Sequence, residues 1–215
     1  MNTRTVVVVG AGGVLGQALL AEFGGAGYHV VGLRRADCDL GDADAVRCAL
    51  ERVVAGVKPV DTLICNAAHL TMVPFAELRL SDFETAWRVS VGGAVGAVQA
   101  VLPGMLRQGK GAILLSGATG SVRGTARFAA FASAKFALRG LAQSLAREVQ
   151  PQGVHVAHVV LDGLVRGSPS IKKFGGSETR SIDPLEAAQA YRWLAEQPSS
   201  AWTHELDLRP HNERF

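Results

Sequence analysis

Short apolar runs alternate with longer amphipathic segments along this chain of 215 residues. Runs of valine, isoleucine and leucine are typical of parallel strands that are buried on both faces. They predict six strands, at residues 6–9, 30–33, 62–65, 112–115, 154–160 and 205–208. The segments between them predict five helices, at residues 15–23, 43–57, 82–107, 127–149 and 184–196. This alternation predicts an α/β fold with a doubly wound parallel sheet, covered by helices on both faces.

The length of the chain fits a single domain, residues 1–215. Two irregularities interrupt the alternating pattern. Only a short loop separates the second predicted strand from Asp39, so we expect the fold to be shortened after that strand. Residues 164–182 are rich in Gly, Ser, Lys and Arg, and they predict either a substrate lid or a disordered loop.

Composition narrows the class of protein. The formal net charge is +3 and the basic residues are scattered along the chain, so we predict no nucleic-acid partner. No apolar run reaches the roughly 20 residues that span a bilayer, so we predict no membrane partner. The chain enters its first predicted strand almost at once, which leaves no room for a leader segment.

The spacing of cysteine and histidine predicts no metal site. Cys38, Cys48 and Cys65 are odd in number and are not paired as in metal motifs, which favours reduced thiols and a cytoplasmic location. His155 and His158 stand three apart in a predicted strand, so their side chains should face opposite sides of the sheet.

A glycine-rich loop follows the first predicted strand and opens the first predicted helix. Glycines let the backbone and the helix N-terminus approach a pyrophosphate closely. The loop therefore predicts dinucleotide binding, and tight packing of helix on strand is the alternative. Its residues are Gly10, Gly12, Gly13, Val14, Leu15 and Gly16.

The end of the second predicted strand should decide which cofactor is bound. An acidic side chain there would accept hydrogen bonds from the adenosine ribose, but Arg34 and Arg35 occupy the place. Guanidinium groups suit a 2′-phosphate by charge and by geometry, which favours NADP(H). Alternatively, both arginines are solvated and paired with Asp37 and Asp39.

The segment Phe131-Ala132-Ser133-Ala134-Lys135 lies in a predicted helix, where residues four apart share one face. Together with the glycine-rich loop it resembles the short-chain dehydrogenase/reductase family, whose usual reactive pair is Tyr-x-x-x-Lys. The resemblance implies a Rossmann-like fold, and it implies that Lys135 binds the nicotinamide ribose. Phenylalanine stands at the tyrosine position, and its ring has no proton to give to a substrate.

Further segments carry the same resemblance. Residues 111–163 and 200–210 resemble a bacterial subgroup of the family that shares the Phe-Ala-Ser-Ala-Lys sequence. The resemblance also implies further cofactor-binding residues, which are Asp39 and Leu40 against the adenine and Asn66, Ala67 and Ala68 along the cofactor.

Other reactive groups of the family are missing from this chain. The family serine that holds the substrate oxygen would fall at Gly117 or Ala118. Ser116 and Thr119 flank this point, and either hydroxyl could replace the serine or simply bond to nearby backbone. The family asparagine would fall at Ser90, so only the lysine is unchanged among the four expected groups.

Two residues are candidates for the missing acid. His69 follows the Asn-Ala-Ala segment, and an imidazole titrates in the right range, although a loop histidine without function is the alternative. Asp162 stands where the family has Pro-Gly after a strand. Burial beside a cofactor could keep this acid protonated, or it could cap a backbone turn.

The first functional hypothesis is an NADP(H)-dependent oxidoreductase that acts on a small carbonyl compound or an enone. An enone needs no acid at the carbonyl itself, which softens the loss of the phenol. The second hypothesis is a non-redox enzyme, such as a lyase, isomerase or cyclase, on the same scaffold. The third is an inactive cofactor-binding or partner protein.

The resemblance also implies a homodimer or homotetramer that is formed through the two long helices. Small residues on one of them would permit close contact between helices, and packing inside the core explains them nearly as well. They are Gly92, Gly93, Ala94, Gly96 and Ala97.

Overall fold

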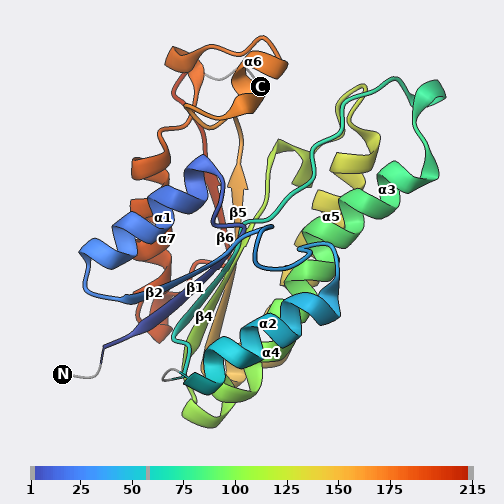
Figure 1. Cartoon of the computed structure of the whole chain (residues 1–215). Helices are drawn as coiled ribbons and strands as arrows, with labels where there is room; N and C mark the ends of the chain where they lie inside the picture. Colours follow the sequence, from blue (N-terminus) through green and yellow to red (C-terminus); the bar gives the residue numbers. More distant parts are fainter. Residues whose placement is uncertain (1–2, 57–58, 213–215) are drawn as a thin grey trace.

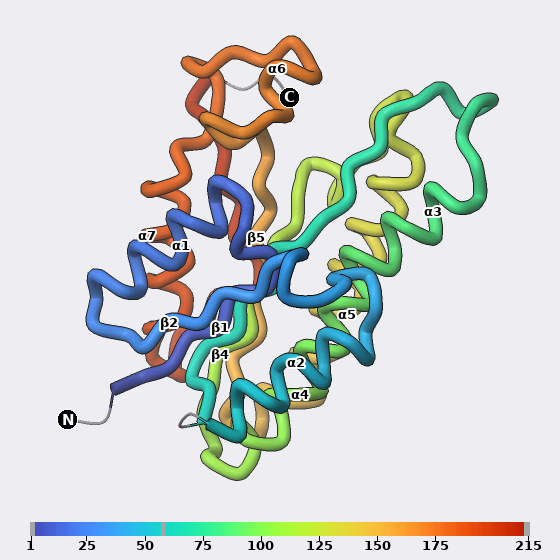
Figure 2. The backbone as a smooth tube through the Cα atoms, in the orientation of Figure 1, coloured from blue at the N-terminus to red at the C-terminus, as the bar shows by residue number. Residues whose placement is uncertain are grey.

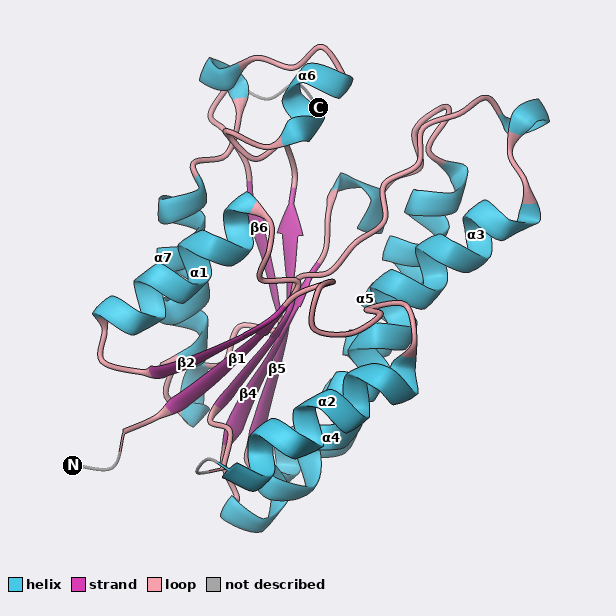
Figure 3. Cartoon of the chain, in the orientation of Figure 1, coloured by secondary structure: helices cyan, strands magenta, loops and turns pink. Residues whose placement is uncertain are grey.

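The computed structural model describes residues 3–56 and 59–212. Its centre is one parallel sheet of six strands in the order β2-β1-β3-β4-β5-β6 (Figures 1 and 3). The strands are β1 (Thr5–Val9), β2 (His29–Leu33), β3 (Thr62–Cys65), β4 (Gly111–Ser116), β5 (Val154–Leu161) and β6 (Glu205–Leu208). The predicted fold class, a doubly wound parallel sheet in a single Rossmann-like domain, is confirmed.

Helices cover both faces of this sheet (Figure 1). They are α1 (Val14–Gly25), α2 (Ala43–Gly56), α3 (Leu80–Trp87), α4 (Gly93–Gln108), α5 (Ala129–Val149), α6 (Pro169–Lys173) and α7 (Pro184–Ala195). Successive strand residues point to opposite faces, so the sheet forms two apolar cores. Its side chains meet α1 and α7 in one core and α2, α4 and α5 in the other.

Two of the predicted helices differ from the observed ones. The helix predicted at 82–107 begins at Leu80 and is interrupted by a π-helix, Arg88–Gly92, before α4 continues to Gln108. The helix predicted at 127–149 begins only at residue 129, because Arg127 has a φ of 71° that no α-helix accepts. Elsewhere the predicted ends shift by one or two residues, and Val57 lies outside the described residues.

The predicted shortening after β2 is present. Residues 34–42, all of them described, contain no helix or strand, and β2 lies at the edge of the sheet. The chain passes directly into α2, which packs on α4. A Cβ at Gly93 would lie 2.4 Å from the Leu40 carbonyl oxygen, and one at Gly96 would lie 2.1 Å from that of Ala43. The small residues of α4 are thus used for packing inside one chain.

The continuous helical run Leu80–Gln108 is apolar enough to cross a membrane by length and composition, with a mean hydropathy of 1.6 over its best window. The prediction that no run reaches this length is therefore wrong. The fold buries 56% of that window, and α4 packs against α2, β3 and β4. This is the environment of a core helix.

The segment 164–182 follows β5 and runs above the carboxyl ends of the strands (Figure 2). It contains α6, a 3₁₀ turn at Glu178–Arg180, and a bridge between Val165 and Ile182. Ile171 of α6 is buried. These contacts give the segment a defined path, and its role as a substrate lid stays a prediction.

Candidate active site

The glycine-rich loop and the Asn66 segment meet where the sheet changes direction, between β1 and β3. The chain adds β2 on one side of β1 and β3 on the other, and ligands of open α/β sheets bind at the carboxyl ends of strands at such a point. The Asn66 amide group donates a hydrogen bond to the Gly10 carbonyl oxygen (3.2 Å). A Cβ at Gly10 would lie 2.6 Å from the Ala67 nitrogen, and the φ of Gly10 is 88°. The backbones therefore touch without side chains between them.

The glycines of the loop have two different roles. Gly16 is a packing residue, because its Cβ would lie 2.5 Å from the Gly10 carbonyl oxygen. Gly13 precedes the first turn of α1, is exposed, and has nothing within 4 Å of the place of a Cβ. Gly12 faces only the Arg34 side chain, with its Cβ position 3.9 Å from Cγ. Tight packing explains Gly10 and Gly16 but leaves Gly12 and Gly13 unexplained.

Both arginines at the end of β2 are exposed. Asp37 accepts a hydrogen bond from the Arg34 backbone nitrogen (2.7 Å), and Asp39 accepts one from the Gly41 backbone nitrogen (2.9 Å). These acids therefore order the loop rather than neutralise the guanidinium groups. Within residues 3–56 and 59–212, neither Arg34 nor Arg35 forms an ion pair.

A cavity of about 660 Å³ opens at the carboxyl ends of the central strands. Asn66 and Ala68 line it from the switch point, and Phe131 and Lys135 line it from α5. Residues 161–165 and the segment that follows β5 complete its wall, with Asp162 at the strand end. Ser116 also lines it, so the cavity joins five of the predicted site residues with Asp162.

Lys135 and Phe131 face each other, as the helical spacing predicts. The Lys135 ammonium nitrogen lies 5.8 Å from the centre of the Phe131 ring. The lysine is 2% exposed and donates a hydrogen bond to the Ser116 carbonyl oxygen (2.7 Å). Burial lowers the pKa of Lys135 to about 8, because the charged form loses its hydration.

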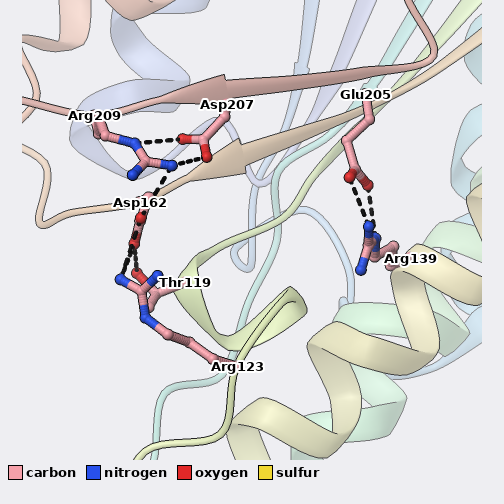
Figure 4. A network of polar contacts seen from close by, with 7 residues as sticks. All are labelled: Thr119, Arg123, Arg139, Asp162, Glu205, Asp207 and Arg209. Carbon is pink, nitrogen blue, oxygen red and sulfur yellow. Dashed lines mark hydrogen bonds and ion pairs between the residues drawn. The ribbon is translucent and has the colours of Figure 1, made fainter. Parts of the chain in front are cut away.

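Asp162, which lines the cavity, is the centre of a polar network (Figure 4). Its carboxylate is buried and accepts hydrogen bonds from the Thr119 hydroxyl (2.7 Å) and from Arg123 Nη2 (2.9 and 3.2 Å). Arg209 Nη2 lies 3.5 Å from its second oxygen and also pairs with Asp207. A carboxyl that faces two guanidinium groups is placed as an acceptor, which is the opposite of the proton-donor role considered from the sequence. Its partners are side chains rather than a backbone turn.

Comparison with known proteins identifies the family. The family model described as short chain dehydrogenase matches residues 34–170, more than half of the chain. The chain belongs to the short-chain dehydrogenase family.

Individual members of the family match over different lengths. L-xylulose reductase of Mesocricetus auratus is 30% identical over 199 residues, which cover 86% of this chain and 78% of that protein. The 17-beta-hydroxysteroid dehydrogenase type 1 of Homo sapiens is 36% identical over 138 residues, which cover 61% of this chain. This chain therefore spans only 42% of the human enzyme.

Solved structures agree with the assignment. A short-chain dehydrogenase from Rhodopseudomonas palustris superimposes with a TM-score of 0.83 at 31% identity, over 97% of this chain and 99% of that one. Two more distant structures share the fold and differ in cofactor. A serine dehydrogenase complexed with NADP⁺ has a TM-score of 0.82 at 21% identity, over 99% of this chain and 97% of its own. An NAD⁺-bound xylitol dehydrogenase has a TM-score of 0.85 at 20% identity, over 97% of this chain and 98% of its own.

Ser116 does not present its hydroxyl to the face of the sheet where Phe131 and Lys135 lie. Its Oγ accepts a hydrogen bond from the Tyr191 hydroxyl (2.7 Å), which belongs to α7 on the other face of the sheet. Only the Ser116 carbonyl oxygen reaches Lys135. The sequence-based assignment of the Ser116 hydroxyl is therefore corrected, because alternate residues of β4 point to opposite faces.

His158 fills the space beside Gly117, one of the two positions at which the resemblance would place the family serine. A Cβ at Gly117 would lie 2.3 Å from His158 Nε2. The ring is fully buried, its Nδ1 contacts Glu205 (3.2 Å), and Glu205 pairs with Arg139 (2.7 Å). Burial lowers the pKa of His158 to about 4, so the ring is neutral. Sequence reasoning missed this residue, and only the opposite facing of His155 and His158 was predicted.

The remaining candidates lie at the edge of the site. Ala68 and Leu70 line the cavity, whereas His69 between them is not among the described lining residues. The structure therefore does not place it over the cavity.

Ser90 lies in the π-helix that interrupts the run of α3 and α4. It is 2% exposed, and its hydroxyl has no hydrogen-bond partner in the described part of the chain. Single π-turns inside helices occur often at functional sites.

A serine at position 117 should not rebuild the family site. We expect Gly117→Ser to lower the free energy of unfolding by about 1 to 3 kcal/mol, because the side chain collides with the fully buried ring of His158. Urea denaturation of the purified variant measures this. The double variant with His158→Ala should recover part of the loss, and additive losses would contradict the collision.

The buried ammonium group predicts a pH dependence of stability. The pKa of Lys135 in the folded chain, about 8, lies below its ordinary value of 10.5. Between these pH values the unfolded chain holds a proton that the folded chain has lost, so the free energy of unfolding rises with pH. From pH 8 to 9.5 the gain is about 1 to 2 kcal/mol. Lys135→Met should remove this rise in urea titrations, and an unchanged slope would refute the shifted pKa.

Proposed function

We propose that this short-chain dehydrogenase is an NADP(H)-dependent oxidoreductase that acts on a small carbonyl compound or an enone with a degenerate catalytic centre. The observation that carries the proposal is the single cavity in which Lys135 and Phe131 face each other beside Asn66. In the family, the cavity with this arrangement binds the nicotinamide of the cofactor and the substrate side by side. Here the lysine is retained, and three other positions hold residues without the expected reactive groups: Phe131 for the tyrosine, Gly117 or Ala118 for the serine, and Ser90 for the asparagine.

The residues at the switch point fit a dinucleotide. Gly13 leaves open space before the first turn of α1, where a pyrophosphate can accept hydrogen bonds from backbone nitrogens. The Ser168 hydroxyl is a buried polar group of the cavity wall without a partner in the described residues, as expected for a group that meets a ligand. Lys135 and Asn66 would hold the nicotinamide half. When bound, NADPH supplies the hydride for reduction of the substrate.

The two arginines support NADP(H) over NAD(H). Arg34 and Arg35 stand exposed at the end of β2, beside the glycine-rich loop, and Asp37 and Asp39 are committed to backbone groups. A guanidinium group without an ion pair suits the 2′-phosphate of NADP(H), which NAD(H) lacks.

The cavity wall supports a small and largely apolar substrate. Three phenylalanines and three leucines line it, and they are Phe128, Phe131, Phe174, Leu70, Leu161 and Leu164. Apolar side chains of this kind hold the body of a small ligand, and a few polar groups orient it. An enone fits the loss of the phenol, because hydride addition at its β-carbon needs no acid at the carbonyl.

Nucleotide binding is the direct test of this function. We expect NADPH to bind the purified protein, which the change in nicotinamide fluorescence measures. We also expect NADPH to be oxidised in the presence of some members of a panel of aldehydes, ketones and enones, which the fall in absorbance at 340 nm measures. Gly13→Ala should weaken NADPH binding about tenfold or more, because its methyl group occupies the open space without disturbing the fold. Gly25→Ala, at the other end of α1 with equal free space, is the matched control. No NADPH binding by the parent chain would refute the function.

Cofactor preference can be tested separately. Replacing Arg34 and Arg35 with alanine should weaken NADPH binding about tenfold, because a charge-assisted contact is lost, and should leave NADH binding nearly unchanged. Parallel fluorescence titrations with both nucleotides measure the ratio. Arg147→Ala, on the far end of α5, is the control. An equal loss for both nucleotides would contradict a 2′-phosphate contact.

A further inference from the structure

Arg123 reaches the cavity from the loop after β4 and is held there by a buried carboxylate. Its side chain is 41% exposed, whereas that of Asp162 is 2% exposed. A single terminal nitrogen, Nη2, donates to both oxygens of Asp162. Nε and Nη1 have no acceptor among the described residues, so this guanidinium keeps donors for another partner.

The position of this guanidinium group is fixed by three neighbouring strands. Thr119 and Arg123 follow β4, Asp162 follows β5, and Arg209 follows β6. The three strands are adjacent in the sheet, so their carboxyl ends meet at one edge, as Figure 4 shows. The Asp162 carboxylate accepts a hydrogen bond from the Thr119 hydroxyl and forms an ion pair with Arg209. These contacts fix the carboxylate, and the carboxylate in turn orients Arg123.

The groups that the sequence proposed for catalysis are engaged elsewhere or lie outside the cavity lining, although the Ser168 hydroxyl and Arg180 also line the cavity. Lys135 donates to the Ser116 carbonyl oxygen, and the Ser116 hydroxyl is engaged by Tyr191. Phe131 has no donor, and His69 lies outside the described lining. Arg123 is a charged donor that lines the cavity and is held by a buried partner.

We propose that Arg123 is a catalytic residue that binds the oxygen anion formed on the substrate, and that Asp162 is its positioning residue. This inference rests on the proposed function. Hydride addition to a carbonyl carbon moves the electron pair of the C=O bond onto oxygen, and a preorganised cation stabilises that charge. Arg123 keeps its own protons, since a guanidinium group is not deprotonated in proteins. The proton that completes the alcohol comes from water, which leaves hydroxide to the solvent.

The experiment uses 4-nitrophenol as a probe of oxyanion binding, because its phenolate form absorbs visible light and its ring matches an apolar cavity. The absorbance of the probe is titrated against pH with excess folded protein, with and without NADP⁺. We expect the bound probe to ionise about one pH unit lower than the free probe, a tenfold preference for the phenolate. Arg123→Gln should abolish this shift, and Arg123→Lys should retain part of it.

Two further variants separate the positioning of Arg123 by Asp162 from the general effect of positive charge in the cavity. Asp162→Asn should reduce the shift, because the guanidinium loses its anchor. Arg180→Gln removes another arginine of the cavity wall and should leave the shift unchanged. Thermal unfolding of each variant reports whether the fold is intact.

The outcomes separate this inference from the proposed function. A shift that survives Arg123→Gln, an equal loss in Arg180→Gln, or a parent protein that does not bind the phenolate would overturn the role of Arg123. An Arg123-dependent shift in a protein that never oxidises NADPH would leave Arg123 as an oxyanion-binding residue, and it would overturn the oxidoreductase together with the catalytic role of Arg123. If 4-nitrobenzaldehyde is reduced, Arg123→Gln should lower kcat about 100-fold with little change in KM.

Discussion

The fold depends on direct contact between two backbones at the carboxyl ends of β1 and β3. Gly10 adopts a φ of 88° and leaves no room for a Cβ against Ala67, while Gly16 packs on the Gly10 carbonyl oxygen. Any side chain at Gly10 or Gly16 would separate the loop from its neighbour. Because the contact sets where α1 begins and where Asn66 stands, it also sets the boundary of the cavity.

Burial determines how the polar groups of the site are oriented, because each buried group must find a hydrogen-bond partner. Ser116 and Asp162 are both nearly inaccessible, and each is held by a partner far away in the sequence, Tyr191 on α7 and Arg123 in the loop after β4. A buried carboxylate is tolerated only with compensating charge and hydrogen bonds. The network around Asp162 supplies both, so the same contacts that satisfy it also aim a guanidinium group at the cavity.

Much of the architecture could be predicted because valine runs and glycine turns are local signals. The strands lie within one or two residues of their predicted bounds, and the facing of Phe131 and Lys135 follows from helical periodicity. The π-helix at Arg88–Gly92 has no such local signal. Contacts such as His158 against Gly117 join residues about forty apart, and spacing alone does not reveal them. For Ser116, the strand was predicted but not which face its hydroxyl would take.

The loss of structure after β2 changes what borders the sheet. In the described chain β2 pairs with β1 alone, and its outer hydrogen-bonding edge has no neighbouring strand. Arg34 continues directly from that edge strand. A nucleotide that binds Arg34 would therefore stabilise an edge strand that is otherwise hydrogen-bonded on one side only. On the proposed function, amide hydrogens of β2 are the ones whose exchange with solvent is most sensitive to cofactor, while β4 and β5 are protected with or without it.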